Sequence, residues 1–216
     1  MIGAGCGAVI DRIVRWLALA RINPNVLTFL GLVINIWAAF LFAMGSSDAH
    51  VQARRFRWAA AVVIGAGLFD MVDGRVARAT DRVTRFGGFF DSVLDRYSDL
   101  ALFIGLLVYY ASINRFGYIV LTAVVMMGSV MISYVRARAE CTIPKCKVGF
   151  LERPERVVLI IIGGLFNRIA AVLWVIAVLS NLTVIHRMIY TWRETKQLED
   201  AQLRSVRDTK VLKANL

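Results

Sequence analysis

A cluster of aspartates in the middle of the chain has the residue types and the spacing to do chemistry. Six of the 15 acidic residues fall in this stretch, and all are aspartate: Asp70, Asp73, Asp81, Asp91, Asp95 and Asp99. Asp70 and Asp73 are three residues apart and Asp91 and Asp95 are four apart, so each pair shares a helix face. Such charges in apolar segments are costly unless a cation binds between them. Because carboxylates on rigid helices suit Mg²⁺ or Mn²⁺, the sequence predicts a divalent metal site.

Small residues and one arginine accompany these carboxylates. The small residues recur at helical spacing and would let a backbone or ligand approach closely: Gly74, Ala77 and Gly87. Arg78 returns to the helix face of Asp70 eight residues later and can hold a phosphate group. Asp81 and Asp99 are instead interpreted as helix caps or as partners in interfacial ion pairs.

The aspartates belong to a chain with the composition of a helical membrane protein. Apolar residues make up 58% of its 216 residues and charged residues 19%, against about 45–50% and 25% in soluble domains. Three cysteines are too few, and odd in number, for a disulfide framework. We therefore expect an all-α integral membrane protein with six transmembrane helices, preceded by an interfacial amphipathic helix.

The apolar runs divide the chain into three parts. Residues 1–23 are expected to form the interfacial helix, residues 24–192 the six-span domain, and residues 193–216 a polar tail that is helical and solvated or disordered. A polar loop is expected over residues 46–57. The spans themselves are expected at about 26–44, 58–74, 87–111, 118–134, 154–166 and 169–190.

The basic residues predict how the chain sits in the membrane. The formal net charge is +11, and 21 of the 26 Lys and Arg residues fall on the side of the two termini if there are six spans. The positive-inside rule then places both termini and the aspartate cluster on the cytoplasmic side of the inner (plasma) membrane. The basic group at residues 54–57 fits this topology poorly. No nucleic-acid partner is expected, because no recognisable binding module is present.

The aspartates and their neighbours form a longer pattern, Asp70-x2-Asp73-Gly74-x2-Ala77-Arg78-x8-Gly87-x3-Asp91-x3-Asp95. It resembles the signature of the CDP-alcohol phosphotransferases (CDP-alcohol phosphatidyltransferases) at all eight specified positions. The resemblance implies transfer of a phosphate-linked group from a CDP-linked donor, such as CDP-diacylglycerol, to an alcohol, with release of CMP. It also implies two divalent ions, Mg²⁺ or Mn²⁺, per site, and a homodimer in the lipid bilayer.

The resemblance assigns a role to each matching residue. It implies that the metals are held by Asp70, Asp73, Asp91 and Asp95, with Asp95 also acting as the general base. It implies that CDP is bound by Asp70, Gly74, Ala77, Arg78, Thr84, Pro24, Asn25 and Thr28. Pro24 and Asn25 have an alternative role, which is to end one helix and begin the next.

A second, basic cluster indicates the acceptor. The segments Ser133–Glu140 and Gly149–Arg156 carry arginines that could form a cationic pocket, and the candidates for binding an acceptor's phosphate are Arg136, Arg138, Arg153, Arg156 and Arg187. These segments look like the phosphatidylinositol-phosphate synthase branch, whose acceptor is inositol phosphate, a phosphorylated polyol. That branch often has Lys at the position of Arg136.

Other interpretations stay open at this point. The arginines could serve only as topology signals. The acceptor could be glycerol 3-phosphate, as in a phosphatidylglycerophosphate synthase, or another alcohol such as serine. A divalent-cation channel or transporter would also use membrane carboxylates, but it does not explain the fixed spacing of the glycines and Arg78.

Overall fold

The protein is helical throughout the part that the structure describes. This computed structural model describes residues 24–79 and 84–214, and the regular elements in those ranges are all α-helices. They are α2 (Pro24–Ala43), α3 (Ala49–Ala79), α4 (Arg85–Ser112), α5 (Phe116–Ala139), α6 (Arg153–Leu165) and α7 (Ile169–Ala214). The expected all-α class is confirmed over these ranges, and the expected interfacial helix at residues 1–23 lies outside them.

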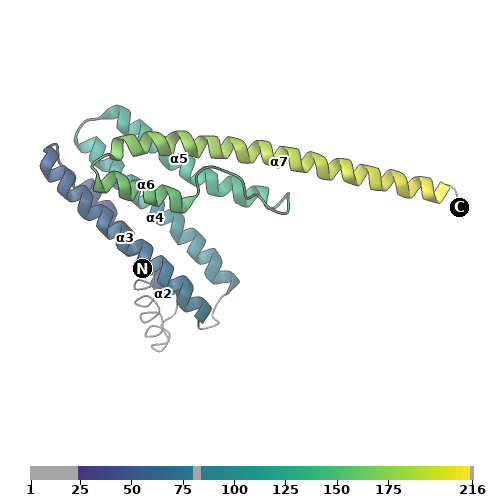
Figure 1. Ribbon diagram of the computed structural model, residues 1–216, viewed down its shortest axis with the longest axis horizontal. Helices are drawn as coiled ribbons and strands as arrows, with labels where there is room; N and C mark the ends of the chain where they lie inside the picture. The colour runs from purple at the N-terminus through teal and green to yellow at the C-terminus, as the bar shows by residue number, and fades with distance from the viewer. Residues whose placement is uncertain (1–23, 80–83, 215–216) are drawn as a thin grey trace, which may run out of the picture.

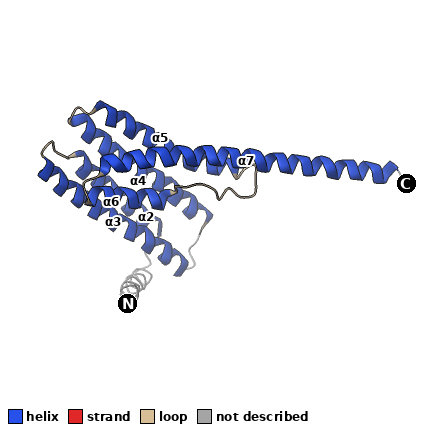
Figure 2. Cartoon of the chain, turned by 45° about the horizontal axis from the view of Figure 1, so that its top comes forward, coloured by secondary structure: helices blue, strands red, loops and turns tan. Residues whose placement is uncertain are grey.

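The helices form a bundle from which one helix projects. Helix α2 packs against α3 and α4, α4 also packs against α5, and the short α6 packs between α3 and α7. Figure 1 shows the second half of α7 running far beyond the body of the bundle, and the turned view in Figure 2 shows the same projection. The α3, α4 and α6 segments that carry the candidate site thus belong to the body of the bundle.

Aromatic side chains and close backbone contacts hold α2, α3 and α4 together. Phe56 packs edge-on against Phe42 and against Tyr109, with ring centroids 5.3 and 5.0 Å apart, which is a favourable arrangement of aromatic rings. Gly105 permits the contact between α2 and α4, because a Cβ atom there would lie 2.2 Å from the carbonyl oxygen of Ala39. These contacts fix α4 relative to α2 and α3.

Three of the six expected spans are long and apolar enough to cross a membrane. They are residues Asn25–Ala43 of α2, Phe116–Ala139 of α5 and Ile169–Gln202 of α7. Their outward faces carry exposed large apolar side chains, including Trp37 and Trp174, as expected where lipid is the solvent. The other three expected spans are also helices, but α6 has only 13 residues, which is roughly 20 Å and shorter than a bilayer core of about 30 Å.

The prediction of a polar loop over residues 46–57 is wrong, because α3 already begins at Ala49. Asp48 caps this helix, with one carboxylate oxygen accepting hydrogen bonds from the backbone N–H groups of His50 and Val51 at 2.9 and 3.1 Å. The N–H groups of Val51 and His50 lower the pKa of the Asp48 carboxyl below its usual value. Phe56 is buried in the core and holds this polar first part of α3 against the bundle.

The polar tail continues α7 as a helix through Ala214, so of the two expected states of the tail the helical one is confirmed. No break separates the apolar part of α7 from its polar part, and residues on the extension such as Glu199 and Asp200 are exposed. The division of the chain at residues 23 and 192 stays a prediction.

Candidate active site

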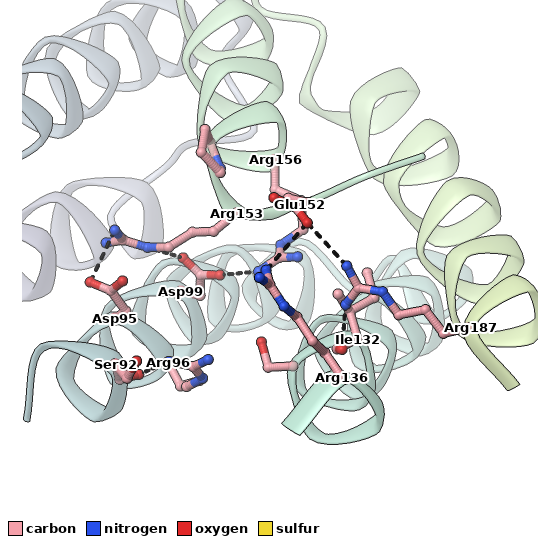
Figure 3. A pocket seen from close by; sticks show the side chains of 12 residues that line it. Ser92, Asp95, Arg96, Asp99, Ile132, Arg136, Glu152, Arg153, Arg156 and Arg187 are labelled. Carbon is pink, nitrogen blue, oxygen red and sulfur yellow. Dashed lines mark hydrogen bonds and ion pairs between the residues drawn. The ribbon is translucent and has the colours of Figure 1, made fainter. Parts of the chain in front are cut away.

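The guanidinium group of Arg153 joins carboxylates from two other helices. Arg153 is the first residue of α6, and its terminal nitrogens lie 3.1 Å from Asp70 Oδ2 on α3 and 3.0 Å from Asp95 Oδ1 on α4. Its Nε lies 3.5 Å from Asp99 Oδ1, one helical turn beyond Asp95. Figure 3 shows Arg153 reaching across to Asp95 and Asp99. Two of the predicted metal-binding aspartates therefore point toward the same place.

The start of α6 is built to hold Arg153 in that position. Pro154 occupies the first turn of the helix, where its missing N–H is no loss. The carboxylate of Glu155 accepts a hydrogen bond of 2.9 Å from the backbone N–H of Glu152. These features define where α6 begins and hence where Arg153 lies relative to α3 and α4.

A glycine on α2 makes room for the Asp70 carboxylate. A Cβ atom at Gly31 would lie 2.9 Å from Asp70 Oδ1, so a side chain there would displace the carboxylate. The carbonyl of Gly31 also accepts a hydrogen bond of 3.2 Å from the amide of Asn35. Gly31 therefore acts as the wall of the site on the side of α2.

The structure describes the side chains of three of the four predicted metal ligands, namely Asp70, Asp91 and Asp95. Asp91 lies one helical turn before Asp95 on the same face of α4, and Asp95 and Asp70 share the guanidinium of Arg153. The side chain of Asp73 lies outside the described residues, although its backbone belongs to α3. Among the described residues no group of three acidic, His or Cys side chains is arranged to hold a metal ion.

The donor set nevertheless fits a hard divalent cation. Asp70 and Asp95 are half-buried and supply oxygen atoms around a shared positive charge, which here is the guanidinium of Arg153. This guanidinium offsets the repulsion between the two carboxylates, as a bound cation would. The residues present are thus compatible with Mg²⁺ or Mn²⁺.

Two of the predicted nucleotide-binding residues lie near each other at the start of α4. Thr84 caps this helix, with its hydroxyl oxygen accepting a hydrogen bond of 2.9 Å from the N–H of Gly87. A Cβ atom at Gly87 would lie 3.0 Å from that hydroxyl oxygen and 3.5 Å from Asn25 Oδ1. Thr28 is buried on α2. The side chains of the other predicted CDP-binding residues besides Asp70 lie outside the described set: Pro24, Gly74, Ala77 and Arg78.

Most of the predicted acceptor-binding arginines line one cavity of about 170 Å³ beside the aspartates. Its charged lining comprises five arginines and three carboxylates, so the cavity is positive overall: Arg96, Arg136, Arg153, Arg156, Arg187, Asp95, Asp99 and Glu152. Arg138 does not line it and is exposed. Sequence reasoning missed Arg96, which is four residues after Ser92 and donates a hydrogen bond to its carbonyl.

Arg187 is the most firmly held of these arginines. Its side chain is only 1% exposed, and its Nε and one terminal nitrogen each donate a hydrogen bond of 2.7 Å to a backbone carbonyl, those of Val148 and Ile132. The remaining nitrogen donates to Glu152 Oε1 at 3.2 Å. The guanidinium of Arg187 is therefore buried and fixed by the backbone, and it forms part of the cavity lining (Figure 3).

Arg156 connects the cavity to the aspartates. It is buried and donates a hydrogen bond of 2.6 Å to Asp99 Oδ2, while its Nε and other terminal nitrogen have no hydrogen-bond partner within the described part of the chain. Of the two roles expected for Asp99, helix cap or interfacial ion-pair partner, the structure shows an ion pair, but a buried one. Sequence reasoning assigned no role to Glu152, although its place directly before Arg153, in a segment that also carries Arg156, was a signal.

Comparisons with known proteins agree with this geometry. Residues 21–193 match the family model described as CDP-alcohol phosphatidyltransferase. The chain is 35% identical to the archaetidylinositol phosphate synthase of Pyrococcus horikoshii over 192 residues, which are 88% of this chain and 93% of that protein. It is 36% identical to the phosphatidylinositol phosphate synthase of Mycobacteroides abscessus over 182 residues, which are 78% of this chain and 77% of that protein.

Solved structures of a third relative have the same fold. The crystal structure of the Mycobacterium tuberculosis phosphatidylinositol phosphate synthase with CDP-DAG bound matches with a TM-score of 0.76 at 31% identity, covering 86% of this chain and 94% of that chain. The structure of the same enzyme in complex with manganese and citrate matches with a TM-score of 0.75 at 32% identity, covering 85% and 88%.

Proposed function

Because the chain belongs to the CDP-alcohol phosphatidyltransferase family and is an enzyme of that class, we propose that it transfers the phosphatidyl group of CDP-diacylglycerol to a hydroxyl of inositol phosphate. CMP is the second product. The observation that carries the choice of acceptor is the positive cavity beside Asp95, in which arginines outnumber carboxylates. A neutral acceptor such as serine has no need of this charge, whereas a phosphate group binds guanidinium groups through paired, charge-assisted hydrogen bonds.

A second cavity supports a lipid donor. It has a volume of about 400 Å³, lies among α2, α3, α4 and α6, and is lined mainly by apolar side chains such as Val63, Leu102 and Ile161. Asp70 and Arg153 also belong to its lining. Acyl chains in this groove would place the polar end of the donor at the carboxylates, while the acceptor enters from the cavity on the other side of Arg153.

Two divalent ions, Mg²⁺ or Mn²⁺, would be held by Asp70, Asp73, Asp91 and Asp95, and when bound they would neutralise charge on the diphosphate of the donor. The manganese in the structure of the Mycobacterium tuberculosis relative supports this use of metal. The cytidine-binding role of Gly74, Ala77, Arg78, Thr84, Pro24, Asn25 and Thr28 is part of the same proposal.

Asp95 takes the proton of the acceptor hydroxyl. It lines the acceptor cavity and lies on the same α4 face as Asp99, so it meets the acceptor where the donor's phosphate also arrives. The hydroxyl oxygen then bonds to the phosphorus that carries the diacylglycerol, and the bond from that phosphorus to the CMP oxygen breaks. The Arg187 and Arg136 guanidinium groups hold the acceptor's own phosphate during this step.

The proposal includes the placement of the enzyme. It sits in the inner (plasma) membrane as a homodimer with six spans, and its active site and both termini face the cytoplasm. The support is the excess of basic residues on the side of the termini and the apolar outer faces of α2, α5 and α7.

The experiment offers purified protein CDP-diacylglycerol, Mg²⁺ and one acceptor at a time, and follows CMP release. We expect turnover with inositol phosphate and little with glycerol 3-phosphate or serine. Turnover with glycerol 3-phosphate but not inositol phosphate would contradict the proposed acceptor. Divalent-cation flux through proteoliposomes without CMP release would contradict the proposed activity altogether. An ether-linked CDP-lipid, run in parallel, tests which lipid donor is preferred, since the Pyrococcus horikoshii relative is named for archaetidyl lipids.

A further inference from the structure

Glu152 places a carboxylate oxygen between two of the acceptor-site arginines. Its Oε1 accepts hydrogen bonds from Arg136 on α5 at 3.4 Å and from Arg187 on α7 at 3.2 Å. Figure 3 shows both guanidinium groups directed at this one carboxylate. An anion therefore already occupies the point in the cavity where two cationic side chains converge.

The arginines do not all need Glu152 to stay in place. Arg187 keeps its two hydrogen bonds to the carbonyls of Val148 and Ile132, and Arg136 keeps an ion pair of 3.2 Å with Glu140. The Glu152 side chain is 48% exposed, whereas that of Arg187 is 1% exposed. The carboxylate is thus the exposed partner, which can turn toward water, while the buried guanidinium is held in place by two backbone carbonyls.

We propose that Glu152 is an internal counter-ion that fills the phosphate position of the acceptor site and is displaced when the acceptor's phosphate binds. This inference rests on the proposed function, since it assumes that the acceptor carries a phosphate. A phosphate monoester carries close to two negative charges at neutral pH and has more acceptor oxygens than a carboxylate, so it can replace Glu152. An unphosphorylated alcohol cannot, and Glu152 therefore acts as a specificity-determining residue.

The counter-ion also lowers the affinity for the acceptor, because its two contacts must break first. Removing its charge while keeping its shape weakens that competition, because an uncharged amide oxygen binds the two guanidinium groups less strongly. Glu152→Gln should therefore lower the KM for inositol phosphate, and the inhibition constant of inorganic phosphate, by about three- to tenfold, the range expected for two partly exposed ion pairs. The KM for CDP-diacylglycerol should not change.

Glu199→Gln is the control. It removes the same charge on the exposed extension of α7, and Glu199 does not line this cavity, so its KM for inositol phosphate should stay at the wild-type value. If Glu152→Gln is unstable, Glu152→Asp serves instead: the shorter side chain withdraws the carboxylate from both arginines and should shift the KM in the same direction by a smaller factor.

The experiments distinguish a failure of the counter-ion role from a failure of the proposed function. Inhibition by inorganic phosphate that depends on Arg187 but is unchanged or weakened in Glu152→Gln would overturn the counter-ion role and leave the proposed function intact. A wild-type enzyme that turns over serine and is insensitive to inorganic phosphate would overturn the proposed acceptor, and the counter-ion role with it.

Discussion

The buried guanidinium of Arg156 donates a hydrogen bond of 2.6 Å to Asp99 Oδ2, so one ion pair lies beneath both the aspartates and the arginine cavity. The other oxygen of Asp99 lies 3.5 Å from Arg153 Nε. Arg153 in turn contacts Asp70 and Asp95. A continuous set of charged contacts thus links the acceptor side of the site to the carboxylates of α3 and α4.

Asp99→Asn should destabilise the protein strongly. The substitution leaves Arg156 buried without a counter-charge, which typically costs about 3–5 kcal/mol of unfolding free energy. We expect a marked fall in the midpoint of thermal unfolding in detergent. A double variant, Asp99→Leu with Arg156→Leu, removes both charges and should recover a large part of the loss. Equal loss in the single and double variants would show that the pair itself does not matter.

Gly31→Ala should weaken metal binding without touching the acceptor site. The added methyl group would lie 2.9 Å from Asp70 Oδ1, so the carboxylate must shift, and a shift of this kind typically lowers metal affinity about tenfold. The measurement is the Mg²⁺ concentration that gives half-maximal CMP release, with the KM for inositol phosphate expected to stay constant. Gly65→Ala is the control, because open space surrounds a Cβ atom there. An unchanged Mg²⁺ requirement in Gly31→Ala would argue against Asp70 as a ligand.

The sequence predicts the helices well because apolar runs of helical length leave few alternatives. All six expected spans are helices, and an ion pair was one of the two roles expected for Asp99. The start of α3 was missed because its first two turns are polar, and their helicity depends on the Asp48 cap and on the burial of Phe56. Neither contribution is visible in a hydropathy pattern.

Contacts between residues that are far apart in the chain could not be predicted from the sequence. Arg153 and Asp70 are 83 residues apart, and only the packing of α6 against α3 brings them together. The position of Arg187 is fixed by hydrogen bonds to backbone carbonyls of an irregular loop and of α5. Such bonds do not depend on residue type, so a sequence pattern does not predict them. The sequence therefore predicted which arginines to consider but not that Glu152 lies between two of them.

Asp95→Asn should slow the chemical step while leaving the donor bound. An amide cannot take the proton of the acceptor hydroxyl, and loss of a general base typically lowers kcat by about 10²- to 10⁴-fold. The KM for CDP-diacylglycerol should change much less. Asp200→Asn makes the same chemical change on the exposed extension of α7 and should leave both constants at wild-type values. A large rise in the KM for CDP-diacylglycerol with little change in kcat would assign Asp95 to donor binding instead.

Arg136→Ala and Arg138→Ala form a matched pair that tests the acceptor cavity. Both residues lie in the last turn of α5, but Arg136 lines the cavity and Arg138 does not. Removing a guanidinium that holds a phosphate typically costs tenfold or more in binding, roughly the value of a hydrogen bond to a charged group. We therefore expect the KM for inositol phosphate to rise about tenfold or more in Arg136→Ala and less in Arg138→Ala, with the KM for CDP-diacylglycerol unchanged in both. The reverse order would move the phosphate site toward Arg138, which the sequence analysis also names as a candidate.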